Sequence, residues 1–161
     1  MLIPSTTRTR RPMMEEPMKV RDAMTHDVRI TNLDETILSA AQTMADLDAG
    51  VLPVADHDRL VGMITDRDIA IRGIAMGMGP DAKVRDVMTS DVKYCFDDQE
   101  IDDVCRNMGD IQVRRLPVLD HNKRLVGILS LGDIAVAHKN GFAAEALSGI
   151  SRRGGEHSQT A

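Results

Sequence analysis

The chain has 161 residues, enough for one ordinary domain or for two small units that share a core. Hydrophobic residues make up 42% and charged residues 28%, a composition typical of globular proteins rather than disordered or fibrous ones. Lys and Arg number 20 against 25 Asp and Glu, which gives a net charge of −5, and aromatic residues make up only 2%. The chain therefore lacks both the basic excess and the stacking platforms of a nucleic-acid-binding protein, and we expect no nucleic-acid partner.

Residues 1–17 read as a disordered N-terminal tail. They lack the apolar core of a secretory signal, and their Arg-rich, acid-poor start only weakly resembles an organelle transit peptide. No stretch of the chain approaches the roughly 18 apolar residues of a membrane span, so we expect no membrane partner. Cys95 and Cys105 match no metal-binding or redox spacing and are expected to be reduced packing residues of a cytoplasmic protein.

The chain repeats itself at a spacing of 64 or 65 residues. Aligning residues 20–54 with 84–118 gives 14 identities in 35 positions, so two copies of one structural unit are predicted. We place repeat 1 at 18–79 and repeat 2 at 80–139, followed by a short helix and a disordered tail within 140–161. The repeated motifs are VRDAMT at 20–25 and VRDVMT at 84–89, LPV at 52–54 and 116–118, and LVGMI at 60–64 and LVGIL at 125–129.

Each repeat is predicted to have the element order β-α-β-β-α. In repeat 1, Asn32 and Glu35 resemble a capping box that opens a helix, and Gly50 is a typical stop for it. One repeat of about 60 residues buries too little surface to be secure alone. We therefore expect an α+β fold in which two β-α-β-β-α repeats pack as a pseudo-two-fold pair with a cleft between them. The predicted elements are a strand at 28–31, a helix between 32 and 50, strands at 51–55 and 60–65, a helix at about 66–76, a linker at 73–81 and a last short helix at 143–150.

The most informative motif is Gly-x-x-Thr/Ser-x-x-Asp, which occurs at 62–68 and again at 127–133. In both copies it marks a junction where a strand ends and a helix begins. Free backbone N–H groups and a hydroxyl at such a junction suit a phosphate, and a carboxylate one turn later suits the two hydroxyls of a ribose. The same spacing also describes a plain capping box that serves only the helix, and the two interpretations do not exclude each other. The residues concerned are Thr65 and Asp68 in repeat 1 and Ser130 and Asp133 in repeat 2.

Together these motifs resemble a tandem of cystathionine-β-synthase (CBS) domains, also called a Bateman module, over residues 20–137. The resemblance implies a stand-alone regulatory or sensor module without catalysis, which binds an adenosyl ligand such as AMP, ADP or ATP in the cleft between the repeats. It also implies that Asp68 and Asp133 hold ribose hydroxyls, with Thr65 and Ser130 near ribose or phosphate. The remaining implications are adenine contacts around Val28 and Val92, a flat disc-shaped homodimer and a regulated protein that the sequence does not identify.

The two copies differ in charge where a phosphate would lie. Repeat 2 has Arg114 and Arg115 before LPV, where repeat 1 has Gly50 and Val51. Repeat 1 instead carries Arg67 inside its motif. A basic residue just before LPV often meets phosphate in the family that the chain resembles, although a solvated strand end would also explain both arginines. The two sites are therefore expected to be non-equivalent.

Two other classes of function remain as alternatives. The chain would be a structural or protein-interaction module if its clefts were empty and it acted through its dimer surface. An enzymatic function ranks lower, because the sequence supports no pairing of a nucleophile with a base. The histidines show no metal-binding spacing, so we expect no metal and no required cofactor, with AMP or ATP as the favoured ligand.

Overall fold

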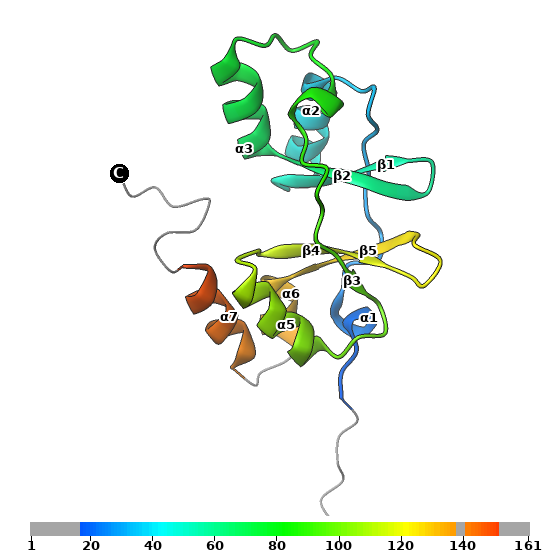
Figure 1. Cartoon of the computed structure of the whole chain (residues 1–161), viewed down its shortest axis with the longest axis vertical. Helices are drawn as coiled ribbons and strands as arrows, with labels where there is room; N and C mark the ends of the chain where they lie inside the picture. Colours follow the sequence, from blue (N-terminus) through cyan, green and yellow to red (C-terminus); the bar gives the residue numbers. More distant parts are fainter. Residues whose placement is uncertain (1–16, 138–140, 152–161) are drawn as a thin grey trace, which may run out of the picture.

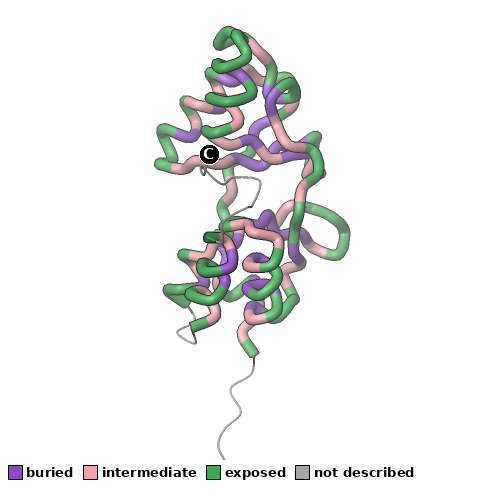
Figure 2. Tube along the Cα trace, turned by 60° about the vertical axis from the view of Figure 1, so that its left-hand side comes forward, coloured by how far each residue is buried: buried purple, intermediate pink, exposed green. Residues whose placement is uncertain are grey.

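The computed structural model describes residues 17–137 and 141–151, so the N-terminal tail predicted at 1–17 and the C-terminal tail predicted within 140–161 lie largely outside the described residues. The described chain forms two lobes, with the strands towards the middle of the molecule and most helices on the outer sides (Figure 1). Figure 2 shows buried segments within each lobe. None of the described helices is both long enough and apolar enough to cross a membrane. The predicted α+β fold is confirmed.

The first lobe is built on an antiparallel hairpin of β1 (Val51–Asp56) and β2 (Arg59–Thr65). His57 in the turn has a φ of 56°. β1 is buried on both faces from Leu52 to Ala55, whereas β2 alternates, and Leu52, Val54 and Ile64 pack with the helices of this lobe in one core. The helices are α2 (Ile37–Leu47), α3 (Asp66–Asp68), a π-helical turn η1 (Ile69–Gly73) and a 3-10 turn η2 (Ile74–Met76).

The second lobe repeats this plan with one additional helix. The two-residue strand β3 (Cys95–Phe96) pairs in parallel with β4 (Arg115–Leu119), which pairs antiparallel with β5 (Leu125–Ser130). The additional helix α7 packs mainly on α5. The helices are α5 (Ile101–Asp110), α6 (Leu131–Ala137) and α7 (Phe142–Ile150).

Three local predictions for repeat 1 are wrong. The strand predicted at 28–31 is reduced to one parallel bridge between Thr31 and Val54. Asn32 does not cap a helix, because its side-chain oxygen accepts hydrogen bonds from two backbone N–H groups within a turn, at 2.9 and 3.0 Å. The helix begins later, with Thr36 as its cap, and ends before Gly50 at Asp48, which adopts the left-handed conformation at a φ of 50°.

Each hydrophobic core combines parts of both sequence repeats. Helix α1 (Val20–Ala23) stands at the start of repeat 1 but buries Val20 in the core of the second lobe, beside Ile101 and Leu129. Helix α4 (Val84–Val87) starts repeat 2 but buries its two valines in the core of the first lobe. The boundaries at 18–79 and 80–139 describe the sequence repeats, whereas the two lobes exchange their first helices.

Backbone hydrogen bonds hold the exchanged segments in place. After α1, Thr25 forms two hydrogen bonds with Ile128 of β5, at 2.9 and 3.0 Å. After α4, Thr89 forms the same pair of bonds with Met63 of β2, both at 2.9 Å. Each lobe therefore adds one residue of the other repeat to the edge of its hairpin.

Two glycines permit this close approach. A Cβ atom at Gly62 would lie 2.8 Å from the carbonyl oxygen of Thr89, and one at Gly127 would lie 2.8 Å from that of Thr25. Because real Cβ atoms do not come so close to backbone oxygens, a side chain at either position would push the exchanged segment away from the strand.

We predict that Gly62→Ala and Gly127→Ala each lower the free energy of unfolding by about 1–3 kcal/mol, the usual cost of overpacking a well-packed site. Equilibrium denaturation with guanidinium measures the change. Gly79→Ala is the matched control, because Gly79 has open space around it. Equal stabilities of the three variants would contradict the proposed steric role.

Candidate functional site

Both copies of the Gly-x-x-Thr/Ser-x-x-Asp motif form capping boxes. Thr65 ends β2, its hydroxyl oxygen accepts a hydrogen bond from the N–H of Asp68 at 3.0 Å, and its own N–H donates to Oδ2 of Asp68 at 2.9 Å. Ser130 and Asp133 make the same pair of bonds at the end of β5, at 3.1 and 2.8 Å. The capping interpretation therefore holds for both repeats, and a ligand would meet side chains that the caps already orient.

The two aspartates differ in their remaining hydrogen-bonding capacity. Oδ1 of Asp68 lies 3.7 Å from Nε of Arg72, and the Asp68 side chain is only 15% exposed. The Ser130 hydroxyl donates to Oδ2 of Asp133 at 2.7 Å, so all described bonds to this carboxylate reach the same oxygen. Within the described part of the chain, Oδ1 of Asp133 has no hydrogen-bond partner and is available to a ligand.

Arg72 also reaches the exchanged segment, which the sequence analysis did not anticipate. Its Nη1 donates to the carbonyl oxygen of Met88 at 3.3 Å and to the hydroxyl of Thr89 at 3.2 Å. Repeat 2 has Ala137 at the equivalent position, and this difference was the only signal in the sequence. Arg72 thus links the cap of the first lobe to the segment after α4. The second lobe has no arginine at the equivalent position to hold the segment after α1.

The structure places Arg115 next to the second cap. Arg115 is the first residue of β4 and stands directly opposite Ser130 in the strand register. Arg114 precedes it and accepts a backbone hydrogen bond from Leu131 at 3.0 Å. Both arginine side chains are exposed. The second cap therefore has an exposed cation beside it.

The first cap has an acidic neighbour instead. Val51 stands opposite Thr65. A Cβ atom at Gly50 would lie 3.0 Å from Oδ2 of Asp66, so this carboxylate occupies the space of a side chain at the position of Arg114. Arg67 lies on the exposed surface of α3. The surroundings of the two caps therefore differ in charge, whereas the non-equivalence of two ligand sites stays a prediction.

Two segments, residues 25–31 and 89–95, cross between the lobes (Figure 1), and they include Val28 and Val92. One segment leaves β5 at Thr25 and reaches β1 at Thr31, and the other leaves β2 at Thr89 and joins the second lobe at β3. Both valines are half-buried. The crossing segments pair with Ile128 and Met63. These residues lie two positions before the caps at Ser130 and Thr65, so each crossing segment starts beside one cap.

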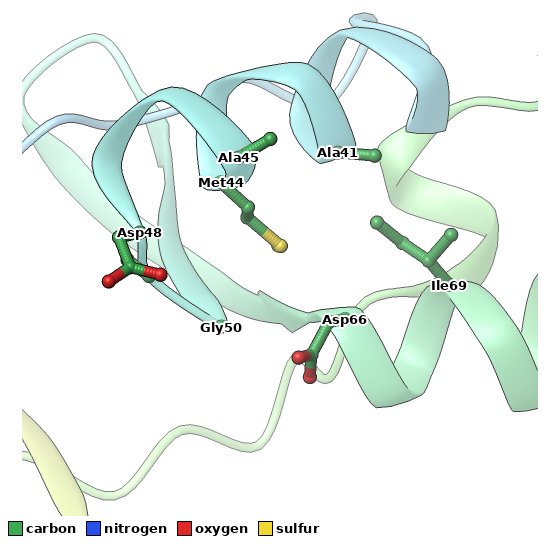
Figure 3. Close-up of a pocket in the computed structure, with 8 residues that line it drawn as sticks. Ala41, Met44, Ala45, Asp48, Gly50, Asp66 and Ile69 are labelled. Atoms are coloured by element: carbon green, nitrogen blue, oxygen red, sulfur yellow. The ribbon is translucent and has the colours of Figure 1, made fainter.

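Two hollows lie on the helices rather than between the lobes. One, of about 390 Å³, lies between α2 and the start of the helical segment after β2, and we call it the α2 hollow. Figure 3 shows Met44 pointing its sulfur into this space, with Ile69 across from it and Asp48 and Asp66 at one end. Another, of about 300 Å³, lies between α5 and α7. Neither corresponds to the predicted cleft, which remains a prediction.

An aromatic and charged cluster lies where the second crossing segment reaches the β4–β5 turn. Phe96 stacks on His121 with ring centroids 5.0 Å apart and meets the edge of Tyr94 at 5.6 Å. The ammonium group of Lys123 lies 4.7 Å from the Phe96 ring centroid. His121 also pairs with Asp98 at 2.8 Å. Sequence spacing gave no signal for this cluster because its members come from two separate segments.

The Asp98–His121 pair shifts both groups towards their charged forms. The hydrogen bond with Asp98 raises the pKa of His121, and the same bond lowers the pKa of Asp98. Any stability that the pair contributes is therefore lost as the pH rises through the pKa of His121, and lost again as the pH falls through that of Asp98.

We predict that His121 titrates above the usual value of 6.5 and that Asp98→Asn returns its pKa towards this value. The C–H signals of the imidazole ring, followed by NMR across the pH range, measure both values. Asp91→Asn, at an exposed aspartate that pairs with Lys93 instead, is the control. An unchanged His121 pKa in Asp98→Asn would contradict the assignment of the shift to this pair.

The cysteines have no sign of a reactive role. Cys95 and Cys105 are buried and free. Burial raises the pKa of Cys95 to about 12 and also raises that of Cys105, so both thiols stay protonated at neutral pH. Across residues 17–137 and 141–151, no three His, Cys, Asp or Glu side chains gather as a metal site would require.

Comparison with known proteins identifies the family. The model of the CBS domain matches residues 20–72 and again 84–140. The chain belongs to the CBS-domain family. Its two matches confirm the predicted tandem pair, and proteins built on such pairs are in general regulatory rather than catalytic. Hypoxic response protein 1 of Mycobacterium tuberculosis is 42% identical over 117 residues, which cover 71% of this chain and 81% of that protein.

Solved CBS-domain structures resemble the chain and carry different bound groups. A structure of Hypoxic Response Protein I with two coordinated zinc ions has a TM-score of 0.68 at 39% identity, covering 74% of this chain and 98% of that one. The CBS domain pair of protein MJ0100, in complex with 5'-methylthioadenosine and S-adenosyl-L-methionine, has a TM-score of 0.68 at 28% identity, covering 75% and 95%. CBSX2 in complex with AMP has a TM-score of 0.66 at 26% identity, covering 74% and 94%.

Proposed function

We propose that the chain is a regulatory module that binds an adenosyl ligand between its two repeats and does not turn it over. One observation carries the proposal: each Thr/Ser–Asp cap stands beside the start of a segment that crosses from one lobe to the other. A ligand that touches a cap and extends along the crossing segment beside it, past Val28 or Val92, would contact the connection between the two lobes. Such a ligand would favour the relative orientation of the lobes to which it binds more tightly. A bound partner would sense this change of orientation.

The residues around each cap suit the parts of such a ligand. A carboxylate oxygen of Asp68 or Asp133 would accept hydrogen bonds from a ribose, with the hydroxyl of Thr65 or Ser130 beside it. Val28 and Val92 would offer half-buried apolar contacts to the adenine. The adenosyl ligands bound by the CBS pairs of MJ0100 and CBSX2 support this class of ligand.

We propose further that phosphate is preferred at the second cap. Arg115 stands beside Ser130, and Oδ1 of Asp133 is available for a ribose hydroxyl. At the first cap Asp66 would repel a phosphate, and Arg72 already engages Asp68. The first site therefore suits an adenosyl ligand without phosphate, and the second suits AMP or ATP.

We also propose that the chain self-associates as a homodimer. The helices of the first lobe leave several large apolar side chains exposed, and burial against a second copy would remove them from water. They are Leu38 and Leu47 on α2, and Ile71, Ile74 and Met76 on η1 and η2.

The test is the binding of AMP and ATP to Asp133→Ala and Asp68→Ala, measured by calorimetry. Each lost hydrogen bond to a carboxylate is worth roughly 1.5–3 kcal/mol. We expect Asp133→Ala to weaken AMP binding at least about tenfold and Asp68→Ala to weaken it less. Wild-type affinity in both variants and in the double variant would overturn the proposal in favour of a structural or protein-interaction module.

Two controls separate ligand contact from folding and phosphate contact from ribose contact. Thermal unfolding of the ligand-free variants measures how much stability the loss of each cap removes. We expect each substitution to lower the free energy of unfolding by about 1 kcal/mol. In the parent protein, ATP and AMP should bind more tightly than adenosine, and Arg115→Ala should remove most of this difference. Raising the salt concentration should weaken the phosphate contribution, because exposed charges are screened.

A further inference from the structure

We infer that Arg72 regulates the first proposed ligand site by competing with a ribose for the carboxylate of Asp68. The inference rests on the proposed function and adds a control element to one of its two sites. A ligand takes Oδ1 of Asp68 only when the guanidinium leaves it, and the segment after α4 determines how firmly the guanidinium is held there. The second site has no such control.

Arg72 is placed to contact the oxygen that the cap leaves for a ligand. It lies on the π-helical turn η1, four positions after Asp68, so both side chains lie on the same side of the helical segment. Its Nε lies 3.7 Å from Oδ1 of Asp68. Oδ2 of the same carboxylate accepts the capping hydrogen bond from the N–H of Thr65. A ribose hydroxyl and the guanidinium would therefore meet at one oxygen.

The other side of the guanidinium holds the end of α4. Nη1 of Arg72 donates to the carbonyl oxygens of Val87 and Met88 at 3.5 and 3.3 Å. It also donates to the hydroxyl of Thr89 at 3.2 Å. The last carbonyls of a helix lack partners within the helix, so a guanidinium beside them satisfies them. Three contacts from one segment thus keep the guanidinium in place beside Asp68.

The burial of the two groups shows which one can give way. The Asp68 side chain is 15% exposed, whereas the Arg72 side chain is 53% exposed. The carboxylate is also fixed by its cap, while the guanidinium borders on water. Arg72 can therefore move into solvent and leave the carboxylate to a ligand.

Repeat 2 has the same cap without the competitor. Ala137 occupies the position of Arg72, 65 residues later. Across the described residues no cation pairs with Asp133, and the cap with Ser130 alone orients its carboxylate. The arginine is therefore not needed to position the aspartate, and its removal from the first lobe should free an oxygen rather than disorder the site.

Competition at Asp68 couples the first site to the connection between the lobes. Thr89 exchanges two backbone hydrogen bonds with Met63, so the segment that holds Arg72 also joins the two lobes. A segment that holds Arg72 firmly favours the ligand-free arrangement and lowers ligand affinity. Because such coupling is reciprocal, a ligand that releases Arg72 weakens the hold on the segment by the same factor.

The experiment measures adenosine binding by calorimetry in Asp133→Ala, which leaves only the first site. Adding Arg72→Ala should tighten adenosine binding about three- to tenfold, because an oxygen of Asp68 becomes free. The same substitution should lower the melting temperature, because the contacts with the segment after α4 are lost. Arg59→Ala is the matched control: it removes an exposed arginine at the other end of β2 and should leave adenosine affinity unchanged.

Two further variants test the coupling and the competition separately. Thr89→Val removes one contact that holds Arg72, so it should tighten adenosine binding when Arg72 is present and have no effect in Arg72→Ala. At the second site, measured in Asp68→Ala, Ala137→Arg introduces the competitor and should weaken adenosine binding. Circular dichroism checks that each variant keeps its fold.

The direction of the changes is decisive, because an arginine with only a structural role would lower stability and affinity together. Unchanged or weaker adenosine binding in Arg72→Ala, or an equal effect of Thr89→Val with and without Arg72, would overturn the inference. Absence of adenosine binding at the first site with and without Arg72 would overturn it too. In each of these cases AMP binding by the parent chain leaves the proposed function standing. Failure of both adenosine and AMP to bind the parent chain would overturn both.

Discussion

The close approach of two backbone segments at Gly62 and Gly127 is the constraint on which the rest of the structure depends. Because neither position carries a side chain, the segment after α4 pairs with β2 and the segment after α1 pairs with β5. These pairings deliver the valines of α4 to one core and Val20 of α1 to the other. They also place the start of each crossing segment beside a Thr/Ser–Asp cap. One steric requirement thus joins the stability of both lobes to the geometry of both candidate sites.

Much of the fold could be predicted because the sequence repeats itself. The motifs LPV and LVG on either side of a polar turn predict the two hairpins. The apolar residues near the C-terminus predict the short last helix. The strand at 28–31 could not be predicted correctly, because a pattern of β-rich residues does not show whether a neighbouring strand is within reach. The exchange of α1 and α4 was also hidden, since VRDAMT and VRDVMT are so similar that the sequence does not assign either helix to a lobe.

The candidate site was only partly predictable, for a related reason. Spacing pointed to Thr65, Asp68, Ser130 and Asp133, but the same spacing describes a cap and a ligand site, and the structure shows the cap. The register that sets Arg115 opposite Ser130 depends on the pairing of two strands. The contacts of Arg72 with Met88 and Thr89 depend on the exchange of α4, and residue types alone do not reveal either arrangement.

The asymmetry between the repeats gives the module its functional character. Both lobes have the same cap, yet one has an arginine beside it and the other a carboxylate. Both present the same helical face, yet α7 covers one and leaves the other open. An internal duplication would have started with two equal halves, and the halves now differ in the surroundings of their caps and in their outer surfaces. The proposed nucleotide binding between the repeats and the proposed contact with a partner at the helices would therefore be separate properties of one fold.

The central claim is that a ligand bridges a cap and the crossing segment beside it. The most direct test is the titration of ¹⁵N-labelled protein with AMP, followed through the backbone amide signals. The amides of residues 130–133 and of residues 25–31 should shift together and saturate at the same AMP concentration, because one ligand would contact both. Shifts confined to one of these segments or to the outer helices, or no shifts at all, would contradict the account.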